Sequence, residues 1–359
     1  MARPNQAELD LSALRHNVSV ARQLAPQSKM LAVVKANAYG HGAPIIATAL
    51  QSHVDALGVA CLEEALELRD CGVTSPVLLL EGVFEEAEIN TAAQLGLWLT
   101  IGNEQQLKWL EDAKLTTPLH CWLKVNTGMN RLGVAPDQAK DCHRRLAASA
   151  NAATDIVTYT HFATADDITS QKTHDQIARF DALSLNALRS AANSAGILAW
   201  PQAHYEWVRP GYMLYGNSPL LVEHANARSL KPVMALTSAV ISLRDIPTGE
   251  TVGYDAKWIA ERASKIATVA IGYGDGYPRQ APDSTPVLIN GQRASLAGRV
   301  SMDMITVDVT DLPQVQLGDE VVLWGKGLSL AEVAHCANTT GYELTTRMPA
   351  RTPRIVVSE

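Results

Sequence analysis

Four polar side chains each follow a short apolar run in the first two thirds of the chain. Lys35 ends "LAVVK", Lys124 ends "CWLK", His161 ends "IVTYTH", and Arg209 follows "WV" in "WVRPG". A single lysine in such a place is usually a surface residue whose amine reaches water. An amine held by a stiff strand at the mouth of a cavity can instead act as a nucleophile or form a Schiff base. Together, the four groups predict one shared pocket.

A second group of residues could bind an anion. In "RPGYMLYG", Gly211 closely follows Arg209, and exposed backbone N–H groups at such a turn can bind negative charge. Asn193 and Ser194 in "AANSAG" offer further donors, although such residues also serve as ordinary caps and turns. An anion site beside a lysine amine is what pyridoxal 5′-phosphate (PLP) requires. The residue types therefore predict a PLP site.

The elements that must position these groups are alternating strands and helices. Apolar residues at helical spacing predict an amphipathic helix over residues 11–25. Short apolar runs then alternate with helical stretches in about eight units before residue 230, which is typical of parallel strands covered on the outside. This number favours a closed (β/α)8 TIM-type barrel, with an open doubly wound sheet as the alternative. In such a barrel, active residues project from the C-terminal ends of the strands.

A second domain is predicted after the barrel. The 359 residues suggest two domains. From about residue 230, β-rich segments are separated by the turn patterns "PTGE", "INGQ" and "QLGDE", and helical pattern is scarce until "SLAEVAHCANTT". We therefore expect a barrel over residues 1–230 and a mostly β domain over residues 231–359, with a boundary at residues 225–232. The first few residues are expected to be able to pair with the C-terminal domain.

Composition excludes several classes of partner. A net charge of -7 gives no electrostatic footprint for nucleic acid or an anionic membrane. No window approaches the roughly 20 apolar residues of a membrane span, and the N-terminus lacks the apolar core of a signal peptide. The five cysteines form no CxxC pair, which favours reduced thiols over disulfides or a zinc site. We expect a cytoplasmic protein without a metal.

Seven motifs along the chain together resemble the alanine racemase family. In order they are "AVVKANAYGHG", "LKVNTGMNRLG", "THFATAD", "WVRPGYMLYG", "VGYDAKW", "IGYGDGYPR" and "GRVSMDM". The resemblance implies an N-terminal barrel, a C-terminal β domain, PLP as cofactor and interconversion of L-alanine and D-alanine. It also implies a homodimer in which each active site is completed by the other subunit.

The resemblance assigns cofactor contacts position by position. Lys35 corresponds to the lysine that holds PLP, Arg209 to the partner of the pyridine nitrogen, and His161 to the residue beside the ring. The residues that correspond to the phosphate ligands are Tyr39, Ser194, Tyr342 and the backbone of Gly211 and Tyr212. Ser190 departs from the pattern, because some members of the family carry a histidine there, beside the arginine–histidine network.

The resemblance also assigns substrate-side groups. Tyr254 corresponds to the second catalytic base, which the partner chain supplies. Arg131 corresponds to the arginine near the phenolic oxygen of the cofactor. Met302 and Asp303 correspond to substrate-side residues, also from the partner, and Tyr273 to a tyrosine that narrows the entrance.

Racemisation needs a base on one face of the α-carbon and an acid on the other, which Lys35 and Tyr254 would supply. A tyrosine is a poor base at neutral pH, because its ordinary pKa is about 10. Positive charge from His161 linked to Arg209 would lower it. An arginine leaves the pyridine nitrogen unprotonated, and we expect this to favour quick proton return over decarboxylation or transamination.

Lys124 lies seven residues before Arg131 and is a candidate for carbamylation. Burial and a like charge both lower the pKa of a lysine amine, and a neutral amine can add carbon dioxide. The resulting carboxylate would hold the Arg131 guanidinium in a bidentate pair. In the resembling family this lysine is often found so modified. The alternative is an unmodified lysine whose amine reaches solvent.

Three other functions remain as alternatives. A barrel-type PLP decarboxylase usually has a carboxylate at the pyridine nitrogen, which Arg209 argues against. A PLP-carrier protein is typically a single barrel, which the β-rich tail and Tyr254 argue against. A racemase of broader substrate range is commonly exported, and the missing signal sequence counts against it. The role, supply of a peptidoglycan precursor or alanine catabolism, stays open.

Overall fold

The computed structural model describes residues 3–358 and divides into two compact units. The barrel unit comprises residues 15–38 and 42–231. The β unit comprises the chain up to residue 14, residues 39–41, and the chain from residue 232 onward. The β unit is therefore discontinuous in sequence, and the barrel unit occupies most of the chain between its parts.

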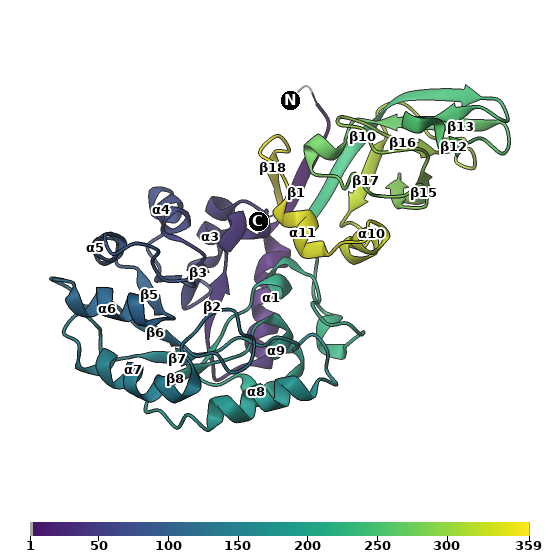
Figure 1. Ribbon diagram of the computed structural model, residues 1–359. Helices are drawn as coiled ribbons and strands as arrows, with labels where there is room; N and C mark the ends of the chain where they lie inside the picture. Colours follow the sequence, from purple (N-terminus) through teal and green to yellow (C-terminus); the bar gives the residue numbers. More distant parts are fainter. Residues whose placement is uncertain (1–2, 359) are drawn as a thin grey trace. The chain divides into compact units, whose positions relative to one another are not determined.

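Eight parallel strands close into a barrel (Figure 1). Each strand pairs with the next, and β9 pairs with β2 through Lys29 opposite Trp207 and Met30 opposite Val208. The strands are β2 (Lys29–Val33), β3 (Ala56–Val59), β4 (Val77–Leu79), β5 (Trp98–Ile101), β6 (Cys121–Lys124), β7 (Val157–Tyr159), β8 (Leu188–Ser190) and β9 (Trp207–Val208). All residues of β3 and β4 are buried, as expected for strands covered on both faces. The predicted closed barrel is confirmed.

Helix α1 precedes the first barrel strand, and further helices connect the barrel strands to one another. The helices are α1 (Leu11–Leu24), α2 (Lys35–Tyr39), α3 (Ala43–Leu50), α4 (Leu62–Asp70), α5 (Glu88–Gln94), α6 (Glu104–Asp112), α7 (Pro136–Ala148), α8 (Gln171–Asp181) and α9 (Ser194–Ala199). Leu14, Val18 and Ala21 form the buried face of α1, at the spacing that predicted this helix. The Asn103 side chain caps α6 by accepting a hydrogen bond from Gln106 N at 2.9 Å.

An eight-stranded sheet forms the β unit. Its strand order is β13-β16-β15-β14-β17-β10-β1-β18, and β10 also pairs with β13. Strand β1 pairs antiparallel with β10 and parallel with β18, so the N-terminal strand lies between two C-terminal ones. The strands are β1 (Gln6–Asp10), β10 (Met234–Ile246), β13 (Ser264–Val269), β14 (Pro286–Ile289), β15 (Gln292–Leu296), β16 (Ile305–Asp308), β17 (Glu320–Trp324) and β18 (Arg354–Ser358).

Shorter elements complete the β unit. A separate hairpin pairs β11 (Thr251–Val252) with β12 (Trp258–Ile259). The two helices are α10 (Leu330–Cys336), which the sequence predicted, and α11 (Gly341–Thr346), which it did not. Helix α11 follows α10 after a short loop, and the Thr340 side chain caps it by accepting from Glu343 N.

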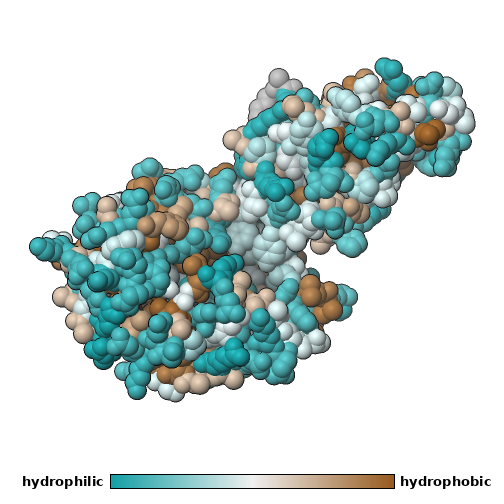
Figure 2. Space-filling model, in the orientation of Figure 1, coloured by the Kyte–Doolittle hydropathy of each residue, from teal (hydrophilic) through white to brown (hydrophobic). Residues whose placement is uncertain are grey.

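On the face shown in Figure 2, hydrophilic side chains predominate and hydrophobic ones form small, separate patches. Such scattered apolar side chains are normal on a surface that faces water. Within residues 3–358, no helix has the length and apolar character needed to cross a bilayer.

Candidate active site

The four predicted strand-end residues all lie at or just after the carboxyl ends of barrel strands. Lys124 is the last residue of β6, and Lys35, His161 and Arg209 come one or two residues after β2, β7 and β9. Their charges act on one another: burial and then the charges of Arg209, Arg131 and Lys35 lower the pKa of Lys124 to about 8. The structure therefore brings the predicted groups together at the carboxyl end of the barrel.

The lysine begins an unusual turn. Strand β2 ends at Val33, and φ is +52° to +54° at each of Ala36, Asn37, Ala38 and Tyr39. Four successive non-glycine residues in this left-handed region cost roughly 1–2 kcal/mol each. Asn37 Oδ1 accepts from Ala43 N at 2.6 Å, and this bond helps to hold the strained turn. Lys35 thus projects from a fixed turn and not from the strand itself.

Arg209 is 3% exposed and is held by neutral acceptors. Its Nη1 donates to Ser190 Oγ at 2.6 Å, and its Nη2 donates to the carbonyl oxygens of Thr160 at 2.6 Å and Ala191 at 3.2 Å. Among residues 3–358 no carboxylate forms an ion pair with it. Burial lowers the pKa of Arg209 to about 10, so the guanidinium remains charged at neutral pH.

His161 lies beside this arginine, with Nδ1 3.5 Å from Arg209 Nη2. Burial, followed by the charges of Arg209 and Lys124, lowers the pKa of His161 well below its ordinary value. The ring is therefore neutral at neutral pH. The positive charge of the linked His161 and Arg209 therefore belongs to Arg209, because burial and the neighbouring cations oppose protonation of His161.

Two further residues at this end of the barrel were not predicted. Tyr159 lies next to two cations, with Lys124 Nζ 5.1 Å and Arg209 Cζ 5.0 Å from its ring centroid. Glu81, two residues after β4, carries the negative charge that acts on Lys124. Glu81 could have been predicted from the sequence, because it follows the apolar run "PVLLL" just as Lys35 follows "LAVV".

Backbone N–H groups converge on Ser194 in the same unit. Ser194 Oγ accepts from Gly211 N at 3.0 Å and from Met213 N at 3.2 Å. Asn193 Oδ1 accepts from Gly196 N at 3.0 Å, so Asn193 is the N-cap of α9. The predicted set of Ser194, Gly211 and the adjoining Tyr212 is therefore contiguous, and Asn193 has the capping role.

The other two predicted phosphate contacts lie in the β unit. The rings of Tyr39 and Tyr342 have centroids 6.1 Å apart. Arg354 donates to Gly40 O through Nε at 3.0 Å and Nη2 at 2.8 Å. Gly40 has φ +80°, and a Cβ there would overlap the Thr345 carbonyl of α11. A glycine is therefore required where the chain after Tyr39 packs against this helix.

Tyr254 also lies in the β unit, in a turn between β11 and β12. It is 70% exposed. The turn has positive φ at Gly253 (77°), Asp255 (63°) and Ala256 (50°), and the Asp255 carboxylate pairs with Arg299 Nη1 at 2.7 Å. A strained, tethered turn that presents a tyrosine to the surface is typical of a functional position.

Two adjacent loops carry the remaining predicted residues. Tyr273 N donates to Ser301 O at 3.0 Å, and Gly274 N donates to Met302 O at 2.9 Å. The Asp303 carboxylate pairs with Arg351. Tyr273, Met302 and Asp303 are therefore brought together, and all three are partly exposed.

The donor set of the barrel fits a phosphorylated, electron-withdrawing ring. Lys35, Lys124, Arg131 and Arg209 gather at one end of the barrel with Glu81 as the acid among the charges that act on Lys124. This excess of cations suits a ligand with several negative groups. A small cavity lined by Lys124, Arg131 and other residues lies in the same region. The lysine, the arginine without a carboxylate and the clustered N–H groups are those that PLP needs.

Comparison with known proteins covers nearly the whole chain. The family models "Alanine racemase, N-terminal domain" and "Alanine racemase, C-terminal domain" match residues 9–219 and 233–356. An alanine racemase of Stutzerimonas stutzeri (strain A1501) is 51% identical over 354 residues, which cover 98% of this chain and 99% of that protein.

Solved structures agree. The biosynthetic alanine racemase of Pseudomonas aeruginosa superimposes with a TM-score of 0.95 at 49% identity, covering 99% of each chain. The alanine racemase of Bartonella henselae, whose crystal structure contains covalently bound pyridoxal phosphate, has a TM-score of 0.90 at 31% identity and also covers 99% of each chain. With both domains matched and a half-identical relative aligned along its full length, this chain belongs to the alanine racemase family.

Proposed function

We propose that this protein interconverts L-alanine and D-alanine with PLP as its cofactor. Family membership over both domains supports the reaction. The cation-rich carboxyl end of the barrel, with Arg209 lacking a carboxylate partner among the described residues, is the observation that supports the cofactor.

The barrel unit offers the groups that would hold the cofactor. Lys35 Nζ would bind its aldehyde carbon, Arg209 would face its pyridine nitrogen, and Ser194 with the N–H groups of Gly211 and Tyr212 would bind its phosphate. Tyr39 and Tyr342 remain predicted phosphate contacts. Bound PLP withdraws electrons from the substrate's α-carbon and so makes the α-proton easier to remove.

Two residues of this chain would move the proton. Once the substrate's amine has displaced Lys35 Nζ from the cofactor, that free amine would act on one face of the α-carbon and Tyr254 Oη on the other, so that one removes a proton while the other returns one. Arg209 keeps its charge at neutral pH and His161 is neutral, so Arg209 would supply the positive charge of this network.

Tyr254 would come from a second copy of the chain. It is 70% exposed in its own protomer, and in the proposed homodimer the partner would use it. Met302 and Asp303 would approach the substrate from the same side, and Tyr273 would narrow the entrance. Arg131 would lie near the phenolic oxygen of the cofactor and the substrate.

The alternatives receive less support. The C-terminal family match and the exposed Tyr254 turn are unnecessary in a PLP carrier, and the neutral surroundings of Arg209 differ from the carboxylate of a decarboxylase. All five cysteines are free thiols, which supports the proposal of a reducing, cytoplasmic location.

The direct test is an assay of the purified holoenzyme with each alanine enantiomer. Circular dichroism should approach zero from either side, and borohydride should fix the cofactor covalently at Lys35, as peptide mapping would show. Lys35→Ala should abolish turnover, whereas the exposed Lys108→Ala should leave it unchanged. Label on another lysine, or release of carbon dioxide from alanine, would contradict the proposal.

A further inference from the structure

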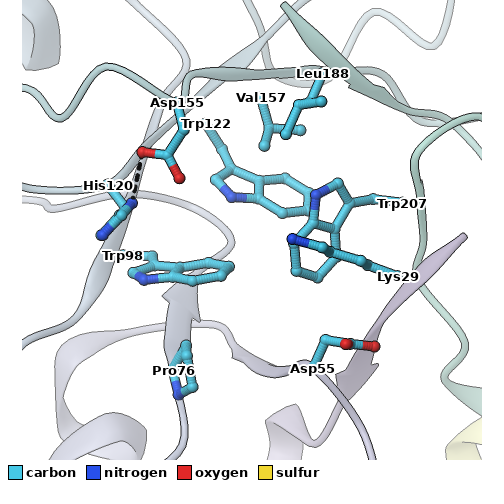
Figure 3. A pocket seen from close by; sticks show the side chains of 10 residues that line it. All are labelled: Lys29, Asp55, Pro76, Trp98, His120, Trp122, Asp155, Val157, Leu188 and Trp207. Carbon is cyan, nitrogen blue, oxygen red and sulfur yellow. Dashed lines mark ion pairs between the residues drawn. The ribbon is translucent and has the colours of Figure 1, made fainter.

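A second cavity lies at the amino-terminal end of the barrel. Its volume is about 240 Å³, and its lining residues begin or directly precede the barrel strands (Figure 3). Lys29, Trp98 and Trp207 are the first residues of β2, β5 and β9, and Trp122 is the second of β6. This is the opposite end of the barrel from Lys35. The residues at the amino-terminal face of such barrels normally stabilise the fold, and a cavity at this face is therefore unexpected.

Three of the seven tryptophans of the chain form the walls. The ring centroid of Trp98 is 6.4 Å from that of Trp122 and 5.7 Å from that of Trp207, and the last two are 5.4 Å apart. Figure 3 shows the indoles and the Lys29 side chain converging on the same space. Indole faces offer large, flat apolar contact to a planar ring.

The carboxylates of the cavity already have partners. Asp55 Oδ2 accepts from Met30 N at 2.8 Å and pairs with Arg22 at 3.2 Å. Asp155 lies 2.9 Å from His120 Nδ1, as the dashed line in Figure 3 marks. These acids are therefore not free to attract a cationic ligand.

One buried donor of the cavity lacks an acceptor, and an exposed cation lies beside it. Trp207 is 4% exposed, and its buried Nε1–H makes no hydrogen bond within residues 3–358. Lys29 forms no ion pair with a described carboxylate, and its Nζ lies 5.4 Å from the Trp207 ring centroid. A buried N–H without an acceptor is costly. The buried Trp207 N–H therefore needs an acceptor, and the exposed, positively charged Lys29 beside it favours an anionic one.

We propose that this cavity is a second small-molecule site, which binds a planar carboxylic acid. The ring would lie against the indoles, and the carboxylate would accept from Lys29 Nζ and Trp207 Nε1. Drug-sized ligands occupy pockets of roughly 300–1,000 Å³, so the smaller volume here suits a single ring. The site is independent of the catalytic end of the barrel.

Benzoate is a suitable probe, with benzylamine as the cation of matched shape. Titration of the holoenzyme should quench tryptophan fluorescence and give saturation-transfer NMR signals with benzoate but not with benzylamine. Saturating alanine should not displace benzoate, because the catalytic site lies elsewhere. Displacement by alanine, equal binding of benzylamine, or absence of benzoate binding up to its solubility would overturn the proposal.

Two variants assign the binding to this cavity. Lys29→Met substitutes an exposed residue and keeps an unbranched side chain. It should weaken benzoate binding about tenfold or more, because it removes a charged hydrogen bond. Trp207→Phe keeps an aromatic face but removes the Nε1 donor, and should also weaken binding. The exposed Lys172→Met on α8 serves as the control and should bind as the wild type does. Unchanged affinity in Lys29→Met would refute the site.

Discussion

Tyr159 contacts two cations at the carboxyl end of the barrel. Lys124 and Arg209 both lie about 5 Å from its ring centroid, and its hydroxyl forms hydrogen bonds with Thr100 Oγ1 and Leu80 O, each at 3.0 Å. Burial raises the pKa of Tyr159 to about 12, so the phenol stays neutral and cannot compensate either charge. An ammonium or guanidinium over an aromatic face gains some stabilisation. Burial, followed by the charges of Arg209 and Arg131, lowers the pKa of Lys124 to about 8, so this amine can lose its proton near neutral pH.

We predict that Lys124 is carbamylated in the active protein. With its pKa near 8, the amine is mostly protonated below that pH and mostly free above it, so carbamate formation should increase as pH rises through about 8. The new carboxylate would pair with Arg131. Incubation with ¹³C-bicarbonate should give a carbamate ¹³C signal that Lys124→Ala lacks.

The same variant should lose activity, about 10²-fold, because misplacing a substrate-positioning group costs roughly that much. Acetate should restore part of the rate by replacing the lost carboxylate. The exposed Lys140→Ala on α7 is the control. A wild-type protein without the carbamate signal at pH 8.5, or full activity in Lys124→Ala, would contradict the prediction.

At the scale of elements, one buried carboxylate joins the loops that carry Tyr273 and Asp303. Asp275 is fully buried and lies 2.7 Å from Arg3 Nη2 and 2.9 Å from Arg351 Nε. It also accepts from Gly272 N at 2.9 Å. Arg351 reaches Asp303 in turn, so the segments around these residues depend on Asp275.

Asp275→Asn should therefore lower the free energy of unfolding by about 3 kcal/mol, the lower end of the cost of breaking a buried ion pair, since both arginines also reach water. Urea unfolding measures this change. Asp311→Asn, which breaks the exposed pair with Arg262, should cost less than about 1 kcal/mol. Equal effects of the two substitutions would show that Asp275 is not the central group.

Much of this organisation could be predicted from the sequence, and the exceptions have physical causes. Apolar runs predicted the barrel strands, but the run "DIVTYTHF" continues past the end of β7 at Tyr159. Strand β7 pairs with the three residues of β8, and one further hydrogen bond, from Thr160 N to Ser190 O at 3.0 Å, follows before the chain leaves the sheet. The left-handed turn after Val34 could not be predicted either, because the sequence has no glycine there before Gly40.

The site shows the same division. Lys35, Lys124, His161 and Arg209 each follow an apolar run, so a periodic pattern could predict that they converge. Asp275 has no such pattern, because its partner Arg3 lies 272 residues away in the chain. Contacts between such distant segments depend on the complete fold.

At the scale of the whole molecule, the proposed active site requires two chains. Lys35 belongs to the barrel unit, and Tyr254 is an exposed residue of the β unit. If each site takes Lys35 from one copy and Tyr254 from another, a homodimer contains two equivalent sites. A chain that lacks Lys35 would then still supply Tyr254 to its partner's site, and a chain that lacks Tyr254 would still supply Lys35 to its own site.

Mixing inactive Lys35→Ala and Tyr254→Phe chains should restore activity. At equal amounts the rate should reach about one quarter of the wild-type value, because half of randomly paired dimers are hybrids with one intact site in two. Tyr254→Phe alone should turn over about 10²–10⁴-fold more slowly, the usual cost of removing a general base. Subunit exchange must be verified by mass spectrometry, and exchange without recovery would place both residues in one chain.

The position of β1 between β10 and β18 has a consequence during synthesis on the ribosome. Strand β1 is translated before the barrel sequence, whereas its two neighbours are translated only after it, and β18 follows the rest of the sheet. The barrel unit can fold first, while β1 has both edges unpaired. An exposed strand edge favours aggregation, so nascent chains should depend on protection of residues 6–10 until β10 and β18 have emerged. A gene fragment that starts at residue 232 would lack this strand, which pairs with both β10 and β18.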